Sequence, residues 1–168
     1  MSSNKTGNNN NEKSCQTTVD SSEDKQWQNL YSKAKQVSEN AYAPYSKFKV
    51  GAALISEQGE VFTGCNVENA SYGLTVCAER NCIASAVANG TTQVTGLVVY
   101  TAQKQLTTPC GACRQVIAEF MSPNAHVHLV NHLGDTQQWR VADLLPAAFT
   151  PQNLKDSSHT DLTHDNNL

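Results

Sequence analysis

The sequence has little charge, few aromatic residues and no long apolar run. Of its 168 residues, 16% are charged and 7% are aromatic. No segment approaches the ~18 consecutive apolar residues that a membrane-spanning helix requires, and the N-terminus lacks the short apolar core of a signal peptide. These absences argue against a membrane or secreted protein, so the sequence predicts a cytoplasmic protein.

An excess of positive charge is also missing. The chain carries 12 Lys and Arg against 15 Asp and Glu, which gives a formal net charge of −3. Proteins that hold nucleic acid usually present a basic face, and a channel for a single strand adds interleaved aromatic side chains. We therefore expect no polymeric nucleic-acid partner, which makes an enzyme acting on RNA strands the weaker interpretation.

The composition divides the chain into three parts. Residues 1–26, with four consecutive asparagines, and residues 155–168 contain few apolar side chains. Such segments cannot bury enough surface to offset the entropy lost on ordering, so we expect a disordered arm and a disordered tail. Residues 27–154 are long enough for one domain with a hydrophobic core.

Helical and strand-like patterns alternate within this domain. Apolar residues recur at helical spacing over 27–41, 78–89 and 111–121, while 48–54, 60–66, 126–131 and 136–141 have strand-like patterns. Residues 94–101 are almost continuously apolar, which is typical of a strand buried on both faces. The interleaving predicts a layered α/β domain with a central sheet.

The strongest motif is Cys77-Ala78-Glu79, followed by Pro109-Cys110-Gly111-Ala112-Cys113. Both pieces fall at predicted helix starts. Cys110 and Cys113 are three residues apart and share a helical face, and the crossover between the motifs can bring Cys77 beside them. In a reducing cytosol, such cysteines favour a metal over disulfides. Three thiolates leave one tetrahedral position of zinc open, as in catalytic sites.

Glu79 and Arg80 complete this motif. A carboxylate two residues after a ligand can lie beside a metal-activated water without binding the metal, and it can then move protons, as the glutamate of zinc deaminases does. Zinc with three thiolates carries net negative charge, which hinders deprotonation of water. We therefore predict that Arg80 and two helix N-termini draw off negative charge, with Arg80 donating hydrogen bonds to a ligand sulfur.

Other interpretations of the cysteines remain open. The set could form a closed structural zinc site or simply be buried thiols. Closure would require a fourth ligand, for which the candidates are Cys65, Cys82, His126, His128 and His132.

Five stretches together resemble homotetrameric cytidine deaminases and span nearly all of residues 27–154. They are YSKFKVGAA (45–53), GCNVENASYG (64–73), CAER (77–80), PCGACRQ (109–115) and LLPAAF (144–149). The first two stretches and the last narrow the likeness to enzymes of free nucleosides. Cysteine instead of histidine at position 77 points the same way. Thr107, Thr108 and Thr150 depart mildly from the family pattern.

The resemblance implies a three-layer fold, with a five-stranded mixed sheet in the order 2-1-3-4-5 flanked by helices. It implies hydrolysis of cytidine and 2′-deoxycytidine to uridine and 2′-deoxyuridine with release of ammonia, a pyrimidine-salvage reaction. One zinc per subunit would be held by Cys77, Cys110 and Cys113. Activated water would add to C4 of the base while Glu79 protonates N3.

The resemblance also assigns substrate contacts, some of them shared between subunits of a homotetramer. Asn66 and Glu68 would bind the ribose 3′-hydroxyl, Ala70 and Tyr72 would reach a neighbour's ribose, and Phe149 would close over the base from another subunit. From the residues alone, Asn66 would be a turn residue and Phe149 simple packing. The full substrate-binding set implied is Phe48, Asn66, Glu68, Ala70, Tyr72, Ala78 and Phe149.

Two rival functions remain at this stage. One keeps the zinc chemistry but acts on an aminonucleoside antibiotic, and the substrate-binding set separates it from a cytidine deaminase. The other is a catalytically silent zinc scaffold that binds protein or RNA through its asparagine-rich arm, for which Glu79 would be dispensable.

Overall fold

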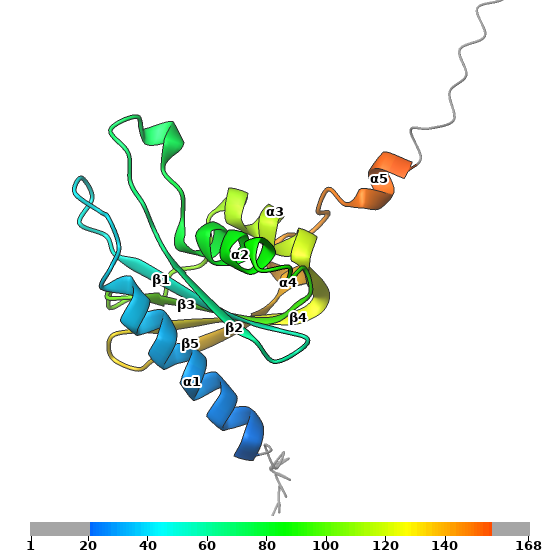
Figure 1. Cartoon of the computed structure of the whole chain (residues 1–168), viewed down its shortest axis with the longest axis horizontal. Coiled ribbons are helices and arrows are strands. Elements are labelled where there is room, and N and C mark those ends of the chain that lie inside the picture. The colour runs from blue at the N-terminus through cyan, green and yellow to red at the C-terminus, as the bar shows by residue number, and fades with distance from the viewer. Residues whose placement is uncertain (1–20, 156–168) are drawn as a thin grey trace, which may run out of the picture.

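A single five-stranded sheet organises the chain in the computed structural model, which describes residues 21–155 (Figure 1). The strands are β1 (Val50–Ser56), β2 (Val61–Cys65), β3 (Val94–Thr101), β4 (Met121–Asn131) and β5 (Thr136–Arg140). Their order is β2-β1-β3-β4-β5, with β3 and β4 parallel and the other pairs antiparallel. The mixed sheet and its order confirm the expected fold class.

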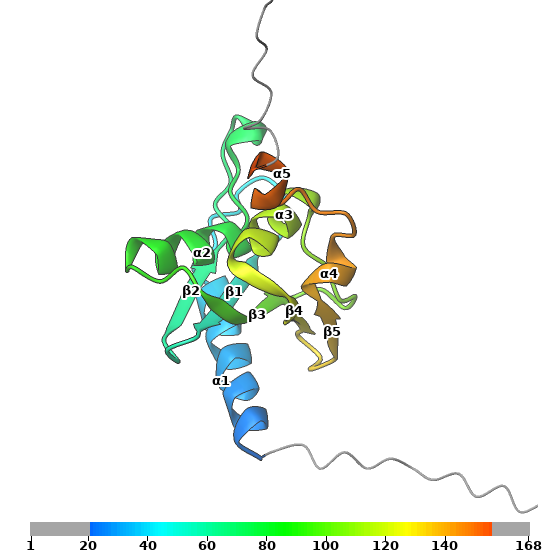
Figure 2. The same ribbon diagram turned by 90° about the vertical axis from the view of Figure 1, so that its right-hand side faces the viewer.

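Helices cover both faces of the sheet and create three layers (Figure 2). Helix α1 (Ser21–Ser38) lies on one face, while α2 (Ala78–Ala88) and α3 (Gly111–Phe120) lie on the other, with the short α4 (Val141–Leu144) beside α3. The 3-10 helix η1 (Tyr72–Leu74) and α5 (Pro151–Lys155) lie away from the sheet. No helix within residues 21–155 has the length and apolar character needed to cross a membrane.

Several boundaries differ from those expected. Helix α1 begins at Ser21, so residues 21–26 are helical although we assigned them to the polar arm; extending a helix that already packs on a sheet requires little apolar content. Strand β4 begins at Met121 and runs through Pro123, because residues 122–125 lie in a gap of the β3–β4 register where proline costs no ladder bond. The rest of the predicted arm and tail lies outside the described residues.

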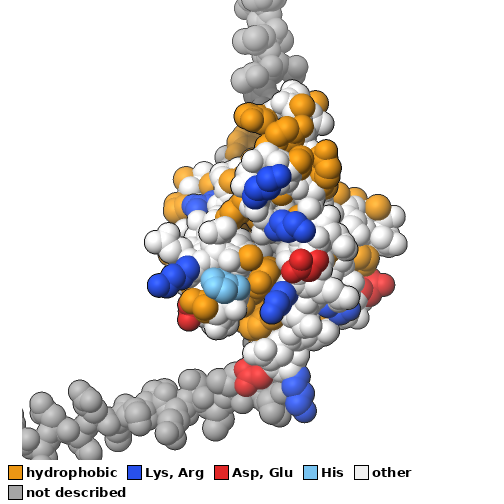
Figure 3. Space-filling model, turned by 90° about the vertical axis from the view of Figure 1, so that its left-hand side faces the viewer, with side chains coloured by type: hydrophobic (Ala, Val, Ile, Leu, Met, Phe, Trp, Pro, Cys, Tyr) orange, Lys and Arg blue, Asp and Glu red, His pale blue; other side chains and the backbone are white. Residues whose placement is uncertain are grey.

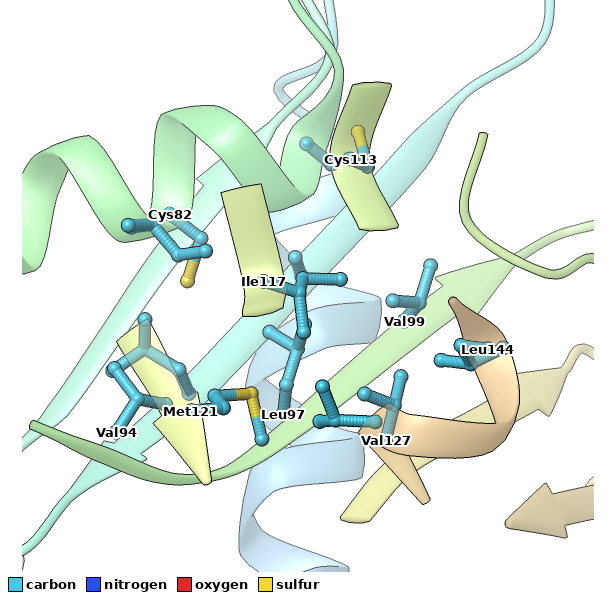
Figure 4. Close-up of a cluster of buried hydrophobic side chains, with 14 of the residues drawn as sticks. Cys82, Val94, Leu97, Val99, Cys113, Ile117, Met121, Val127 and Leu144 are labelled. Atoms are coloured by element: carbon cyan, nitrogen blue, oxygen red, sulfur yellow. The ribbon is translucent and has the colours of Figure 1, made fainter. Parts of the chain in front are cut away.

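The large core cluster lies under α2, α3 and α4 (Figure 4). Leu97 and Val99 of β3 face Ile117 of α3 in this cluster. Gly64 in β2 permits this layer to approach closely, because a Cβ there would lie 2.3 Å from the Cys82 backbone nitrogen of α2. The glycine therefore fixes how deeply α2, and with it the motif at its start, sits on the sheet.

The opposite face packs α1 against the sheet through aromatic rings. Trp27 stacks on His128 with ring centroids 3.6 Å apart, and the hydroxyl of Tyr31 lies 2.9 Å from His128 Nδ1. Burial, together with the nearby His126, lowers the pKa of His128 to about 4. His128 therefore remains neutral at physiological pH and serves as a packing residue beneath α1.

Candidate active site

The three motif cysteines meet where two helices begin. Cys77 is the N-cap residue of α2, Cys110 is the N-cap residue of α3, and Cys113 lies in the first turn of α3. Neither N-cap thiol forms a capping hydrogen bond with its own helix. The sulfurs are thus available to a common ligand, at a place where two helix N-termini favour negative charge.

Their spacing suits zinc. The sulfurs of Cys77 and Cys110 lie 3.8 Å apart, and the ligand atoms of all three cysteines lie within 4.8 Å of one another. Sulfurs held about 2.3 Å from a tetrahedral zinc are about 3.8 Å apart. The three cysteines therefore fit a zinc ion without rearrangement of the helices.

Within residues 21–155 this metal-ligand group has three members, and none of the five candidates for a fourth ligand belongs to it. Cys82 faces the core, where its thiol donates to the Phe62 carbonyl and burial raises its pKa to about 12. His128 lies under α1, and His132 contacts the Gln103 carbonyl. The arrangement leaves one coordination position open, which favours a catalytic over a closed structural site.

The thiols of the cluster differ in pKa. Pairing with Cys113, together with the nearby charge of Arg80, lowers the pKa of Cys77 to about 5, whereas the same pairing and burial raise the pKa of Cys113. Of these two thiols, Cys77, which lies beside the guanidinium of Arg80, therefore loses its proton more readily. Readily formed thiolate is the state that zinc binds.

Arg80 is held beside the cysteines by its own contacts. Its Nη2 donates to the Thr75 carbonyl at 3.0 Å, and its interactions with Cys77 and Cys113 raise its pKa against the effect of burial. Its buried Nε has no hydrogen-bond partner among the described residues. These positions support the predicted bond to a ligand sulfur, which stays a prediction.

Glu79 lies at the start of α2 with only 4% of its surface exposed. Burial raises the pKa of its carboxyl, and the charge of Cys77 raises it further. Glu79 lines the same cavity as Cys77 and Cys110 without joining the metal-ligand group. It thus has the position expected of a carboxyl that transfers protons next to a metal.

This cavity has a volume of about 250 Å³ and extends outward from the cysteines. Phe48, Asn66 and Glu68, three of the predicted substrate-binding residues, line it. It adjoins a second hollow of about 390 Å³ that shares Ser46, Glu68 and Thr75 with it. The structure therefore places the predicted proton-transfer carboxyl and these three side chains around one continuous space.

Asn66 and Glu68 also organise the wall of the cavity. The Asn66 amide accepts from the Val50 backbone NH and donates to the Phe48 carbonyl, both at 2.8 Å. The Glu68 carboxylate accepts from the backbone NH groups of Tyr45 and Ser46 and from the Ser46 hydroxyl, and these bonds lower its pKa. Both residues therefore hold the segment that leads to Phe48, whatever else they bind.

The remaining substrate-binding residues lie in three different places, with Phe149 in the segment between α4 and α5 and away from η1 (Figure 1). Ala78 is buried at the start of α2, whereas Ala70, Tyr72 and Phe149 are exposed and absent from the lining of the 250 Å³ cavity. Tyr72 is 74% exposed and Phe149 is 59% exposed. Hydrophobic side chains gather at the end of the molecule where η1 projects (Figure 3). A single chain thus leaves these aromatic side chains uncovered.

Sequence reasoning missed two residues that position the site. Arg114 donates to the carbonyls of Pro109 and Leu144 and to the Thr108 hydroxyl, at 2.7, 3.0 and 2.9 Å, and so fixes the segment before Cys110. Gln115 donates to the Phe149 carbonyl at 2.7 Å. An arginine in the first turn of a helix, where the dipole disfavours cations, was the available signal for Arg114.

Several known proteins are similar to this chain along most of its length. The cytidine deaminase of Halalkalibacterium halodurans is 47% identical over 129 residues, covering 77% of this chain and 98% of that protein. A probable cytidine deaminase of Dictyostelium discoideum is 44% identical over 115 residues, covering 68% of this chain and 77% of that protein. The crystal structure of cytidine deaminase from Burkholderia pseudomallei superposes with a TM-score of 0.70 at 49% identity, covering 73% of this chain and 98% of that one.

Residues 24–129 match the family described as the cytidine and deoxycytidylate deaminase zinc-binding region. This range contains both cysteine motifs, Glu79 and most of the cavity wall. The extent of the match, the fold and the cysteine geometry agree: the chain belongs to the zinc-dependent cytidine and deoxycytidylate deaminase family.

Proposed function

We propose that this protein hydrolyses cytidine and 2′-deoxycytidine to uridine and 2′-deoxyuridine with release of ammonia, using one zinc per chain. The single observation that carries the proposal is the cavity in which a three-cysteine group with one open position faces a buried carboxyl. The family match and the named relatives point to the same reaction.

Zinc held by Cys77, Cys110 and Cys113 would lower the pKa of water, so that a nucleophile is available at neutral pH. Glu79 would take a proton from that water and deliver it to N3 of the base. It would later carry the proton of the hydroxyl now bonded to C4 to the departing amine. Its low exposure supports this role, because burial disfavours the carboxylate and helps the group hold a proton between steps.

The remaining cavity wall would bind the nucleoside. Phe48 would pack on the pyrimidine, while Asn66 and Glu68 would hydrogen-bond the 3′-hydroxyl. Their backbone bonds support this assignment because they hold both side chains in one orientation before substrate arrives. Recognition through the 3′-hydroxyl is indifferent to the 2′ position, which fits the use of both nucleosides.

The protein is proposed to work as a homotetramer with shared active sites. Ala70, Tyr72 and Phe149 would complete the site of a neighbouring subunit, and their exposure in the single chain supports this placement. No nucleic-acid polymer and no membrane enter the proposal. We propose a cytoplasmic location for the reaction, because the cytoplasm keeps thiols reduced.

A spectroscopic assay on purified protein tests the function. Cytidine and 2′-deoxycytidine should lose their absorbance, with one ammonia released for each nucleoside consumed. An aminonucleoside antibiotic such as blasticidin should react much more slowly. Preference for the antibiotic would favour the rival deaminase. Bound zinc without turnover of any of these nucleosides would favour the silent scaffold.

A further inference from the structure

The floor of the active-site cavity carries a buried hydroxyl that the proposed reaction does not use. Thr101 is the last residue of β3, lines the 250 Å³ cavity and is 2% exposed. Side chains alternate along a strand, so Thr101 shares the face of Leu97 and Val99, which is the face that α2 and α3 cover. Its side chain is therefore fixed at the bottom of the cavity.

The Thr101 hydroxyl has no hydrogen-bond partner among the described residues. The three other threonines of the cavity differ. The Thr108 hydroxyl accepts from Arg114 at 2.9 Å, the Thr75 hydroxyl accepts from the Asn69 backbone NH at 3.2 Å, and the Thr107 hydroxyl lies 3.5 Å from the Gln105 carbonyl. A buried hydroxyl without a partner is costly, and most such groups in native proteins are satisfied. A polar group entering the cavity would supply what the protein does not.

The topology indicates which part of the base this hydroxyl would meet, an inference that rests on the proposed function. Glu79 belongs to α2, which packs on β2 and β1, whereas Thr101 ends β3 on the other side of β1. With C4 at the cysteine group and N3 at Glu79, the ring carbon C5 points away from Glu79. C5 would then lie on the β3 side of the cavity.

We propose that Thr101 is a specificity-determining residue whose hydroxyl faces C5 of the pyrimidine and selects nucleosides with a hydrogen-bonding substituent there. Val50 and Val99 lie on the same stretch of wall, so an apolar C5 substituent would find packing but leave the hydroxyl unpaired. A site that hydrogen-bonds a substrate hydroxyl discriminates against the analogue that lacks it.

The test compares 5-hydroxymethylcytidine with 5-methylcytidine, which differ by one hydroxyl. The measured quantity is the ratio of their kcat/KM values in the wild type and in Thr101→Val, which has nearly the same shape. The ratio should fall about tenfold in the valine variant, as expected for one lost hydrogen bond. The control Thr101→Ser should retain the wild-type ratio within about threefold.

A thermal melt without nucleoside gives a second measurement. Thr101→Val should melt at the same temperature as the wild type or higher, because it removes a buried hydroxyl that has no partner. A clear drop in Tm would mean that the protein itself satisfies the hydroxyl, and would overturn the proposal.

Three kinetic outcomes would also overturn it: an unchanged ratio in Thr101→Val, a serine variant that behaves like the valine variant, or a wild type that turns over cytidine but neither C5-substituted nucleoside. Failure of the wild type on cytidine itself would instead overturn the proposed function. The cytidine assay therefore separates the two claims.

Discussion

The inner and outer ends of the active-site cavity are built differently. At the inner end, Glu79 and Cys113 are buried where α2 and α3 begin, on helices fixed to the sheet by the main core. At the outer end, Tyr72 of η1 lines the adjoining hollow and is mostly exposed; Phe149 is also mostly exposed but lines neither space. One chain thus brings together the cysteine group and the buried carboxyl, while it leaves these two aromatic side chains uncovered.

The largest effect is expected at the inner end. Glu79→Gln preserves the shape of the side chain but cannot transfer protons, so cytidine turnover should fall by roughly 10²–10⁴-fold. Zinc content, measured by elemental analysis, should remain at the wild-type value because Glu79 lies outside the metal-ligand group. Loss of zinc together with turnover would instead make Glu79 a structural part of the metal site.

A matched pair of cysteine variants tests the metal-ligand group at the inner end. Cys110→Ser removes a proposed ligand and should reduce both zinc content and turnover, the latter by more than about 100-fold. Cys65→Ser alters a half-buried cysteine outside the metal-ligand group and should keep both near wild type. Equal losses in the two variants would show that the serines disturb the fold and not the metal.

The exposed aromatic side chains should show a different pattern. Phe149→Ala should lower kcat/KM for cytidine about 10–100-fold while leaving zinc content unchanged, because the ring is proposed to cover a neighbour's substrate. Leu133→Ala, a truncation of a similarly exposed residue at the β4–β5 turn, is the control and should have little effect. Wild-type kcat/KM in Phe149→Ala would contradict shared sites.

Changes on the sheet face under α1 should alter the stability of the protein without altering the cavity. The pKa of His128 is lowered from 6.5 to about 4 in the folded protein, so the unfolded chain binds its proton more readily between these values. The contribution of neutral His128 to the free energy of unfolding is fully present above about pH 6.5. It declines by about 2–3 kcal/mol as the pH falls toward 4. Unfolding free energies of His128→Phe, which keeps the stack on Trp27, should decline less over this range; parallel curves would refute the assignment.

The smallest effect is expected in the segment before Phe149. Ala147 has a φ of 56°, a left-handed conformation that glycine adopts without the steric cost of a Cβ. Ala147→Gly should therefore raise the free energy of unfolding by about 0.5–1 kcal/mol in denaturant titrations. A decrease would show that the methyl group contributes more by packing than it costs in backbone conformation.

The inner end was also the part best predicted from sequence. The apolar run of residues 94–101 predicted the bounds of β3 correctly, because a run of that length is typical of a strand buried on both faces. The positions of the three cysteines at predicted helix starts predicted their grouping, because helix starts are fixed by local signals. The start of β4 was wrong, because the register gap that tolerates Pro123 depends on a neighbouring strand.

Hydrogen bonds between segments that are distant in the chain could not be predicted from the sequence. The backbone bonds of Asn66 and the three acceptors of Arg114 come from segments distant in the chain, so no local pattern predicts them. Thr101 ends an ordinary buried strand, and its lack of a partner is visible only once its surroundings are known. The resemblance assigned contacts for Tyr72 and Phe149 that one chain alone leaves untested.

The most direct test of the central claim is a zinc titration of metal-stripped protein, with cytidine turnover recorded at each addition. The account predicts that turnover is lost on stripping and returns in proportion to bound zinc, reaching a plateau at one zinc per chain. Full turnover by the stripped protein, or a plateau without activity, would contradict it.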